Sequence, residues 1–143
     1  MIDVSNYSKC ISALQLAYQK SEEVDDDTIE FEIYRAACVK EFELIVEQTA
    51  KLLKKFLYPY FSSNKTTDNL AYKDTFRLAL THNIISENDI EIWLQCRDIR
   101  NQTAHEYGSM LAVEVLEILP KFIQVCNSLI VKFNQINATT TQA

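Results

Sequence analysis

Hydrophobic residues recur along most of this chain at steps of three and four positions, the spacing that places side chains on one face of a helix. A first helix is predicted over about 5–21, and the acidic stretch 21–27 then forms an exposed connection. A second helix is predicted from about 28 to 58, roughly 45 Å long at the rise of an α-helix. Its apolar stripe contains one polar residue, Thr49, and Pro59 with the polar segment after it should end the helix.

The same spacing predicts three further helices. A short one covers 70–81, with Phe76 buried, and another begins after Ser86, whose hydroxyl can cap it. The last helix begins at Ser109 and is apolar over much of its circumference, so we expect one face to enter the bundle and another to contact a second copy of the chain. The residues that widen its apolar stripe are Val113, Val115, Ile118, Phe122, Val125 and Leu129.

The composition favours helices over strands. The 143 residues include one glycine and two prolines, too few for the turns of a β-rich fold, while 48% of the residues are hydrophobic. The expected fold class is therefore all-α, with one domain because this length supports a single core. We place the domain at 1–137 and expect 138–143, which has no core-forming side chain, to be a frayed tail.

Charge and cysteine content restrict the classes of function. The formal net charge is -6 at pH 7, so contact with nucleic acid has to be local. No apolar run reaches the roughly 18 residues of a membrane span, and no signal peptide is recognisable, so we expect a soluble cytoplasmic protein without membrane contact. Cys10, Cys38, Cys96 and Cys126 lack metal-binding spacing and are expected to be reduced core thiols; no metal or cofactor is predicted.

Candidate chemistry is concentrated in the stretch RNQTAHEY, residues 100–107, directly before Gly108. Arg100 continues the line of a buried helical stripe, and its planar fork can bind phosphate oxygens. A histidine with a pKa near ~6.5 can move protons at neutral pH. Such a pair can support metal-independent RNA cleavage, in which His105 would take the proton of a ribose 2′-hydroxyl and Arg100 would stabilise the transition state. A two-fold dimer that faces two copies of the motif would supply a second histidine as the general acid.

Helix geometry restricts how these residues can act together. Arg100 and His105 would point about 140° apart on a regular helix. Either the helix breaks near Gly108 or the pocket is shared between two protomers. Asn101 lies one turn before His105 and could orient its ring.

A plainer interpretation explains the same residues without catalysis. An arginine and a histidine near a helix end are often cations that interact with the helix dipole. Tyr107 would then be a packing residue, and His82 an exposed residue at a helix end. The chain would be a purely structural bundle.

The pattern R-N-x-x-x-H-x-Y, formed by Arg100, Asn101, His105 and Tyr107, resembles the R-x4-H-x-Y motif of HEPN domains of the HepT type, also known as nucleotidyltransferase substrate-binding proteins. The stretch YRAACVKEFELIVEQTAKLLKKFL is similar to the long second helix of that family, with its F-E and E-x-x-x-K-x-L-K features. The resemblance covers about 5–133. The chain departs from the common H-T-Y-D form by reading H-E-Y-G.

This resemblance implies an up-and-down four-helix-type bundle with a short extra helix, which forms a homodimer. It also implies a two-gene pair in which the HEPN chain is an RNase toxin and a cognate minimal nucleotidyltransferase is the antitoxin, with RNA or nucleotide bound at the dimer cleft. By position, Arg100 and His105 would be catalytic, Asn101 supporting, and Tyr107 the residue to which AMP is attached. The alternative is a noncatalytic subunit that binds a nucleotide or substrate for the nucleotidyltransferase.

Overall fold

The computed structural model describes residues 1–103 and 109–142, and within these residues it is built from helices without strands. Its elements are α1 (Ser5–Glu22), α2 (Ile29–Leu57), a short 3-10 turn (Tyr58–Tyr60), α3 (Asn64–Asp68), α4 (Tyr72–Thr81), α5 (Glu87–Thr103) and α6 (Ser109–Gln142). The expected all-α class is confirmed.

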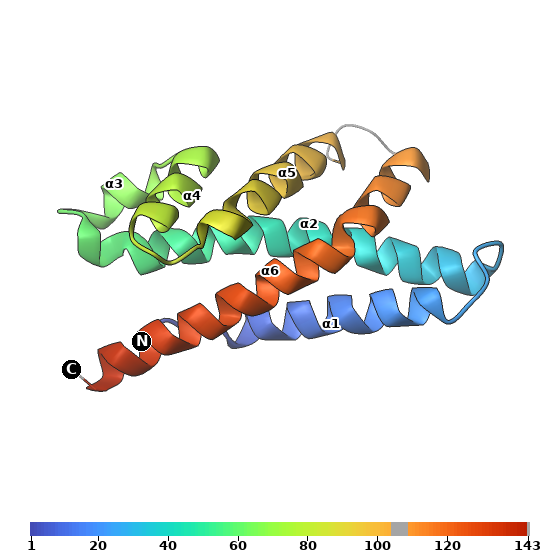
Figure 1. The fold of residues 1–143 in the computed structure, drawn as a ribbon, viewed down its shortest axis with the longest axis horizontal. Helices are drawn as coiled ribbons and strands as arrows, with labels where there is room; N and C mark the ends of the chain where they lie inside the picture. The colour runs from blue at the N-terminus through green and yellow to red at the C-terminus, as the bar shows by residue number, and fades with distance from the viewer. Residues whose placement is uncertain (104–108, 143) are drawn as a thin grey trace.

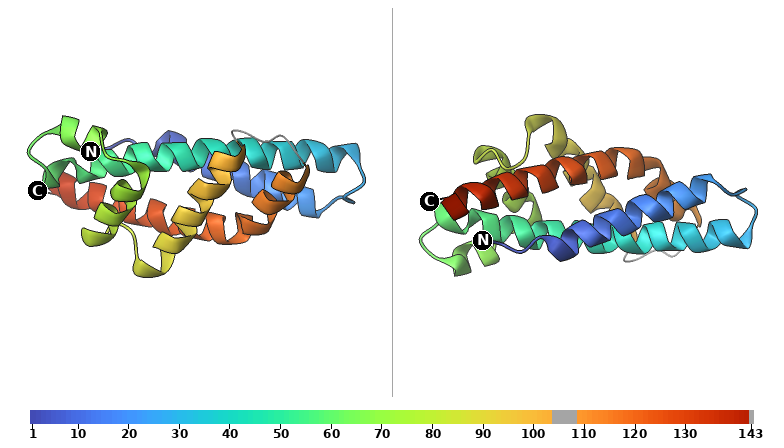
Figure 2. Two further views of the ribbon diagram at one scale, coloured as in Figure 1. Left: turned by 90° about the horizontal axis from the view of Figure 1, so that it is seen from above. Right: turned by 90° about the horizontal axis from the view of Figure 1, so that it is seen from below.

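The four longest helices run up and down (Figure 1). The helix α1 packs along α2, α5 packs along α6, and α2 contacts both α5 and α6. The two views of Figure 2 show α1 on one side of α2, with α4 and α5 on the other side. This arrangement is the predicted bundle, and it leaves a face of α2 next to α4 and α5 on which a site can be built.

The polar segment after Pro59 contains a helix that the hydrophobic pattern did not predict. The Ser63 hydroxyl accepts a hydrogen bond from the Thr66 backbone N–H (3.3 Å), which caps α3 at its first turn. A helix of 5 residues is too short to show a repeat of apolar positions. The segment therefore resembled a loop in the sequence.

Aromatic side chains hold the bundle together along its length. The Phe42 ring lies 4.8 Å from the Phe122 ring, joining α2 to α6 near the middle. The Phe56 ring stacks on Phe133 at 4.2 Å, joining the same two helices nearer to the chain ends. The polar member of the α2 stripe, Thr49, is fully buried and contacts the Tyr7 hydroxyl of α1.

The prediction for the wide apolar surface of α6 was wrong in one respect. Val115, Ile118, Phe122, Val125 and Leu129 are all buried within the single chain, and only Val113 of the widened stripe is exposed. Because α1, α2 and α5 all pack on α6, most of its apolar circumference is covered without a second copy, while Met110, Val113 and Val131 stay exposed. The homodimer stays a prediction, and the buried residues of the widened stripe do not support it.

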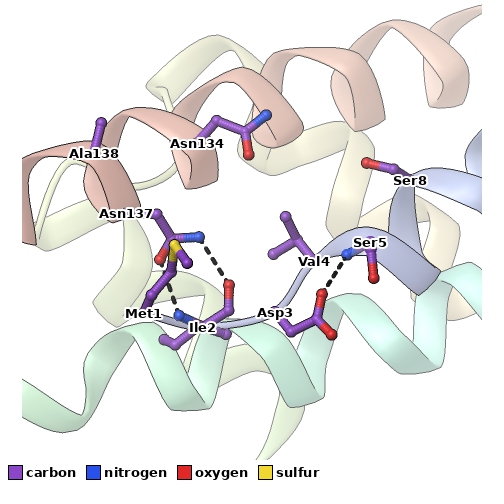
Figure 3. Close-up of a pocket in the computed structure, with 9 residues that line it drawn as sticks. All are labelled: Met1, Ile2, Asp3, Val4, Ser5, Ser8, Asn134, Asn137 and Ala138. Atoms are coloured by element: carbon purple, nitrogen blue, oxygen red, sulfur yellow. Dashed lines mark hydrogen bonds between the residues drawn. The ribbon is translucent and has the colours of Figure 1, made fainter. Parts of the chain in front are cut away.

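The first residues of the chain are attached to the last turns of α6. The Ile2 N–H donates to the Asn137 side-chain oxygen (3.0 Å), and the Asn137 amide donates to the Ile2 carbonyl (2.8 Å), as Figure 3 shows. The helix itself continues to Gln142, beyond the predicted start of the tail at 138. The division into 1–137 and 138–143 stays a prediction.

Candidate functional site

The inward face of α5 fixes the position of its arginines. Trp93 is fully buried, with its ring 5.5 Å from Phe76 of α4 and 5.6 Å from Phe122 of α6. Arg97 and Arg100 follow Trp93 by one and two helical turns, so they lie along the edge of the same face. Both are half-buried, as the line of the stripe predicted.

A groove of about 410 Å³ lies between α2, α4 and α5. Val46 and Ala50 are the aliphatic residues of its lining; the other lining residues are Glu47, Lys51 and Lys54 of α2, Tyr72 of α4, and Arg97, Arg100 and Asn101 of α5. This lining has four cationic side chains and one carboxylate, on a chain whose formal net charge is -6. The groove is therefore a local cationic region of an acidic protein.

Tyr72 holds the α5 wall of the groove in place. The Arg97 guanidinium carbon lies 5.4 Å from the centre of the Tyr72 ring, a cation–π contact. The Tyr72 hydroxyl donates to the Trp93 backbone carbonyl (3.3 Å). Burial raises the pKa of Tyr72, with Cys96 adding to the rise and Arg97 opposing it, so the phenol stays neutral and a donor.

The α2 wall presents two lysines one turn apart. The Lys54 ammonium donates to the Asp68 backbone carbonyl of α3 (3.2 Å). The Lys51 ammonium lies 3.8 Å from the Glu47 carboxylate, but both side chains are more than half exposed, so water weakens this ion pair.

Only part of the predicted site falls within the described residues. Arg100 is half-buried in the last turn of α5, and Asn101 beside it is exposed; both line the groove. His105 and Tyr107 lie outside the described residues. The Arg100 position fits both the phosphate-binding and the helix-dipole interpretations, but the dipole alone does not explain why three other cations line the same groove.

The position of His82 differs from the prediction. It is half-buried rather than exposed, because its ring stacks on Tyr60 at 3.8 Å. It follows the last residue of α4, as expected for a residue at a helix end. This stacking attaches the end of α4 to the 3-10 turn, and His82 is not among the residues that line the groove.

The lysines of the groove were not identified as site residues from the sequence. The sequence feature that could have identified them is the E-x-x-x-K-x-L-K pattern. In this pattern Glu47, Lys51 and Lys54 share one face of α2, away from its core stripe. That pattern is also typical of a solvated helix face with ion pairs. Only the packing of α5 against α2 shows that this face meets Arg97 and Arg100.

Three larger cavities have less suitable chemistry for phosphate, and the smallest of them, about 460 Å³, has one cation, Lys132, opposed by one carboxylate, Asp89. The cavity at the chain ends, about 700 Å³ and drawn in Figure 3, is lined mostly by residues 1–5 and α6, and none of its lining side chains is cationic. The cavity near the α1–α2 connection, about 770 Å³, is lined by Glu22, Asp25, Asp26 and Glu117, which repel anions.

Metal-binding groups, membrane spans and thiols complete the description of residues 1–103 and 109–142. These residues contain no group of three or more His, Cys, Asp or Glu side chains placed to hold a metal ion. None of the helices in the described ranges is long and apolar enough to cross a bilayer. The four cysteines have no disulfides, and burial raises the pKa of Cys38 to about 11 and that of Cys96 to about 12. The predicted reduced thiols are present, with Cys10 the least buried.

Known proteins are similar to this chain in sequence and in fold. A Haemophilus influenzae protein named probable ribonuclease HepT is 28% identical over 102 residues, which are 71% of this chain and 68% of that protein. A solved Haemophilus influenzae structure, described as the fold of a substrate binding domain of a nucleotidyltransferase, matches with a TM-score of 0.76 at 21% identity, over 92% of this chain and 99% of that chain. The family model described as nucleotidyltransferase substrate binding protein like matches residues 2–135. The family expected from the motif is confirmed, and this chain belongs to it.

Proposed function

We propose that this chain is a metal-independent endoribonuclease, the toxin of a pair with a cognate minimal nucleotidyltransferase. The observation that carries the proposal is that Arg100 and Asn101, the described part of the R-N-x-x-x-H-x-Y motif, line a cationic groove in an acidic protein. The name of the Haemophilus influenzae relative, a probable ribonuclease, agrees with this reaction. The family description agrees with a nucleotidyltransferase as partner.

The proposed reaction uses side chains alone. The neutral His105 imidazole removes the proton of a ribose 2′-hydroxyl, and the 2′-oxygen attacks the adjacent phosphorus. The bond from phosphorus to the 5′-oxygen breaks, and a second imidazole, from the other protomer of a homodimer, protonates that oxygen. Arg100 stabilises the charge on the equatorial oxygens, and Asn101 orients the His105 ring. The products are a 2′,3′-cyclic phosphate and a 5′-hydroxyl.

The partner would control the reaction through Tyr107. Transfer of AMP from ATP to the Tyr107 hydroxyl, with loss of the phenol proton and release of pyrophosphate, places a bulky anion two residues from His105, where it excludes RNA by charge and volume. Both chains would act in the cytoplasm, where their RNA substrates are found.

The test of catalysis is cleavage of RNA by the purified chain in the presence of a chelator. The wild type is expected to cut, and His105→Ala and Arg100→Ala are each expected to lower the rate by at least about 100-fold, because a general base and a charge-stabilising donor each contribute that much. His82→Ala is the matched control and should cut like the wild type. Equal cleavage by all four proteins, or cleavage that requires a divalent metal, would contradict the proposal.

Co-expression of wild-type and His105→Ala chains tests the composite cleft. If one cleft needs both histidines of a dimer, equal amounts of the two chains leave only about a quarter of the dimers active, because mixed dimers lack one imidazole. Independent sites would retain about half of the activity. Sedimentation of the wild type as a monomer would exclude the cleft outright.

The second candidate is a noncatalytic subunit that binds a nucleotide for the nucleotidyltransferase. The same groove favours it, since its cations suit the phosphates of a nucleotide as well as those of RNA. ATP binding without any RNA cleavage would favour this candidate over the ribonuclease.

A further inference from the structure

We propose that Lys51, Lys54 and Arg97 form a binding site for backbone phosphates of single-stranded RNA, beside the phosphate that Arg100 contacts. This inference rests on the proposed ribonuclease function and names how its substrate is held. It assigns binding, and no bond making or breaking, to the three side chains.

The charge of the groove supports this assignment. Lys54 and Arg97 make no salt bridge with any described carboxylate, and Lys51 has only the long, exposed contact with Glu47. Cations whose charge is not neutralised by the protein attract a polyanion, and a groove between packed helices concentrates that attraction. An RNA strand is the polyanion that the proposed reaction brings to this place.

Two of the three cations also have contacts that position them before any ligand arrives. The Asp68 carbonyl fixes the Lys54 ammonium, and the Tyr72 ring lies under the Arg97 guanidinium. Lys54 lies in the last turn of α2, where a cation also stabilises the helix end. That role does not account for Arg97, which precedes the last turn of α5 and still lines the same groove.

Tyr72 indicates that the groove binds the backbone of the strand rather than its bases. An aromatic ring with an open face is the usual platform for a stacked base. The Tyr72 ring is already stacked on Phe76 at 4.4 Å and is in contact with the Arg97 guanidinium, so a base would have to displace one of them. Contacts to phosphate carry no sequence information, and we expect this groove to bind RNA of any sequence.

A single strand fits the groove better than a duplex. Duplex binding needs a broad basic surface, whereas the groove is about 410 Å³ and the whole chain has a net charge of -6. A flexible strand can place a few successive phosphates in the groove without bringing the rest of its charge against acidic surface.

The experiment measures the binding of a fluorescently labelled single-stranded RNA by anisotropy, as a function of NaCl concentration. All variants are made in a His105→Ala background so that RNA is not cut. Replacing Lys51, Lys54 and Arg97 together by Gln should reduce the slope of log affinity against log salt by about 2, since each phosphate contact contributes about 0.7 for a single strand. Between 50 and 200 mM NaCl the parent would therefore lose about 20-fold more affinity than the triple variant.

Matched variants separate charge from folding. Lys9→Gln removes an exposed lysine of α1, on the other side of α2, and should leave the slope unchanged. Arg97→Lys keeps the charge and should keep the slope, whereas Arg97→Gln should lower it. Glu47→Gln removes the one carboxylate of the groove lining and should tighten RNA binding. Circular dichroism confirms that each variant is helical.

The outcomes are distinct from those of the cleavage test. A triple variant with the same slope as Lys9→Gln overturns the inference even if the wild type cuts RNA. A parent that binds ATP but not RNA, with ATP binding lost in the triple variant, also overturns it, because the groove then holds a nucleotide. A lowered slope in the triple variant supports the phosphate site, even if the wild type cuts no RNA and the proposed function fails.

Discussion

Two hydrogen bonds explain why the apolar stripe of α2 contains one polar residue, Thr49. The Thr49 hydroxyl donates to the Ile45 carbonyl (2.7 Å), so its only proton is used, and the contact with Tyr7 must be donated by the Tyr7 hydroxyl. Both side chains are buried, and burial raises the pKa of Tyr7 well above its usual value. Thr49 is therefore the acceptor that allows a phenol to enter the core.

Removing the acceptor should cost more than removing the donor. Thr49→Val keeps the shape but leaves the Tyr7 hydroxyl without its oxygen partner, which costs about 1–3 kcal/mol. Tyr7→Phe leaves the Thr49 proton bonded to Ile45 and should cost less. Urea unfolding of both variants and of the double variant gives the coupling free energy. We expect the double variant to lose less unfolding free energy than the two single variants lose in sum. Additive losses would contradict the assignment.

At the scale of the elements, the sequence predicted long helices well and short ones poorly. The predicted 5–21 and 28–58 agree with α1 and α2 within a residue or two, because many apolar positions repeat in each. The 5 residues of α3 are stabilised by local hydrogen bonds, among them the Ser63 cap, and not by a repeat of apolar positions. Periodicity identified the apolar face of α6 but not how many neighbours cover it, and so its second stripe was assigned to another copy of the chain.

One side chain of α6, Asn137, makes both hydrogen bonds that attach Ile2 to this helix. Asn137→Ala removes both hydrogen bonds to Ile2 and should destabilise the protein by about 1–2 kcal/mol, because two partly buried backbone groups lose their partner. Asn134→Ala, in the same cavity, is the control, since Asn134 is exposed (Figure 3). Thermal unfolding and the rate of proteolysis of residues 1–4 are the measurements. Equal behaviour of the two variants would refute this role.

At the scale of the whole molecule, the groove is the feature that the sequence could not provide. Lys54 and Arg100 are far apart in the chain, and α3 and α4 lie between their helices. Lys54 and Arg100 lie in one groove because Trp93 packs between Phe76 and Phe122. The order of hydrophobic and polar residues along the chain does not encode this packing. The motif itself was readable because its residues are close in sequence, but the sequence did not predict that Arg100 and Asn101 line a groove together with lysines of α2.

Buried thiols should make the fold sensitive to alkali. Burial raises the pKa of Cys38 to about 11 and of Cys96 to about 12, against 9.0 for an exposed thiol. Below pH 9 both states hold these protons; above it the unfolded chain loses them first, so the free energy of unfolding falls by about 1.4 kcal/mol per pH unit for each thiol. Urea unfolding under reducing conditions from pH 8 to 11 measures the slope. Cys38→Ala should reduce the fall of the unfolding free energy per pH unit. An unfolding free energy that does not change between pH 8 and 11 would contradict the expectation.

The chain contains one tryptophan, and Trp93 is held where α4, α5 and α6 meet, with its carbonyl bonded to the Tyr72 hydroxyl. Indole fluorescence therefore comes from a single known place, directly behind the wall that carries Arg97 and Arg100. A ligand that draws the Arg97 guanidinium off the Tyr72 ring is expected to disturb the hydrogen bond from Tyr72 to the Trp93 carbonyl, and with it the indole fluorescence. The protein thus contains its own optical reporter of groove occupancy, and no attached dye is needed to observe it.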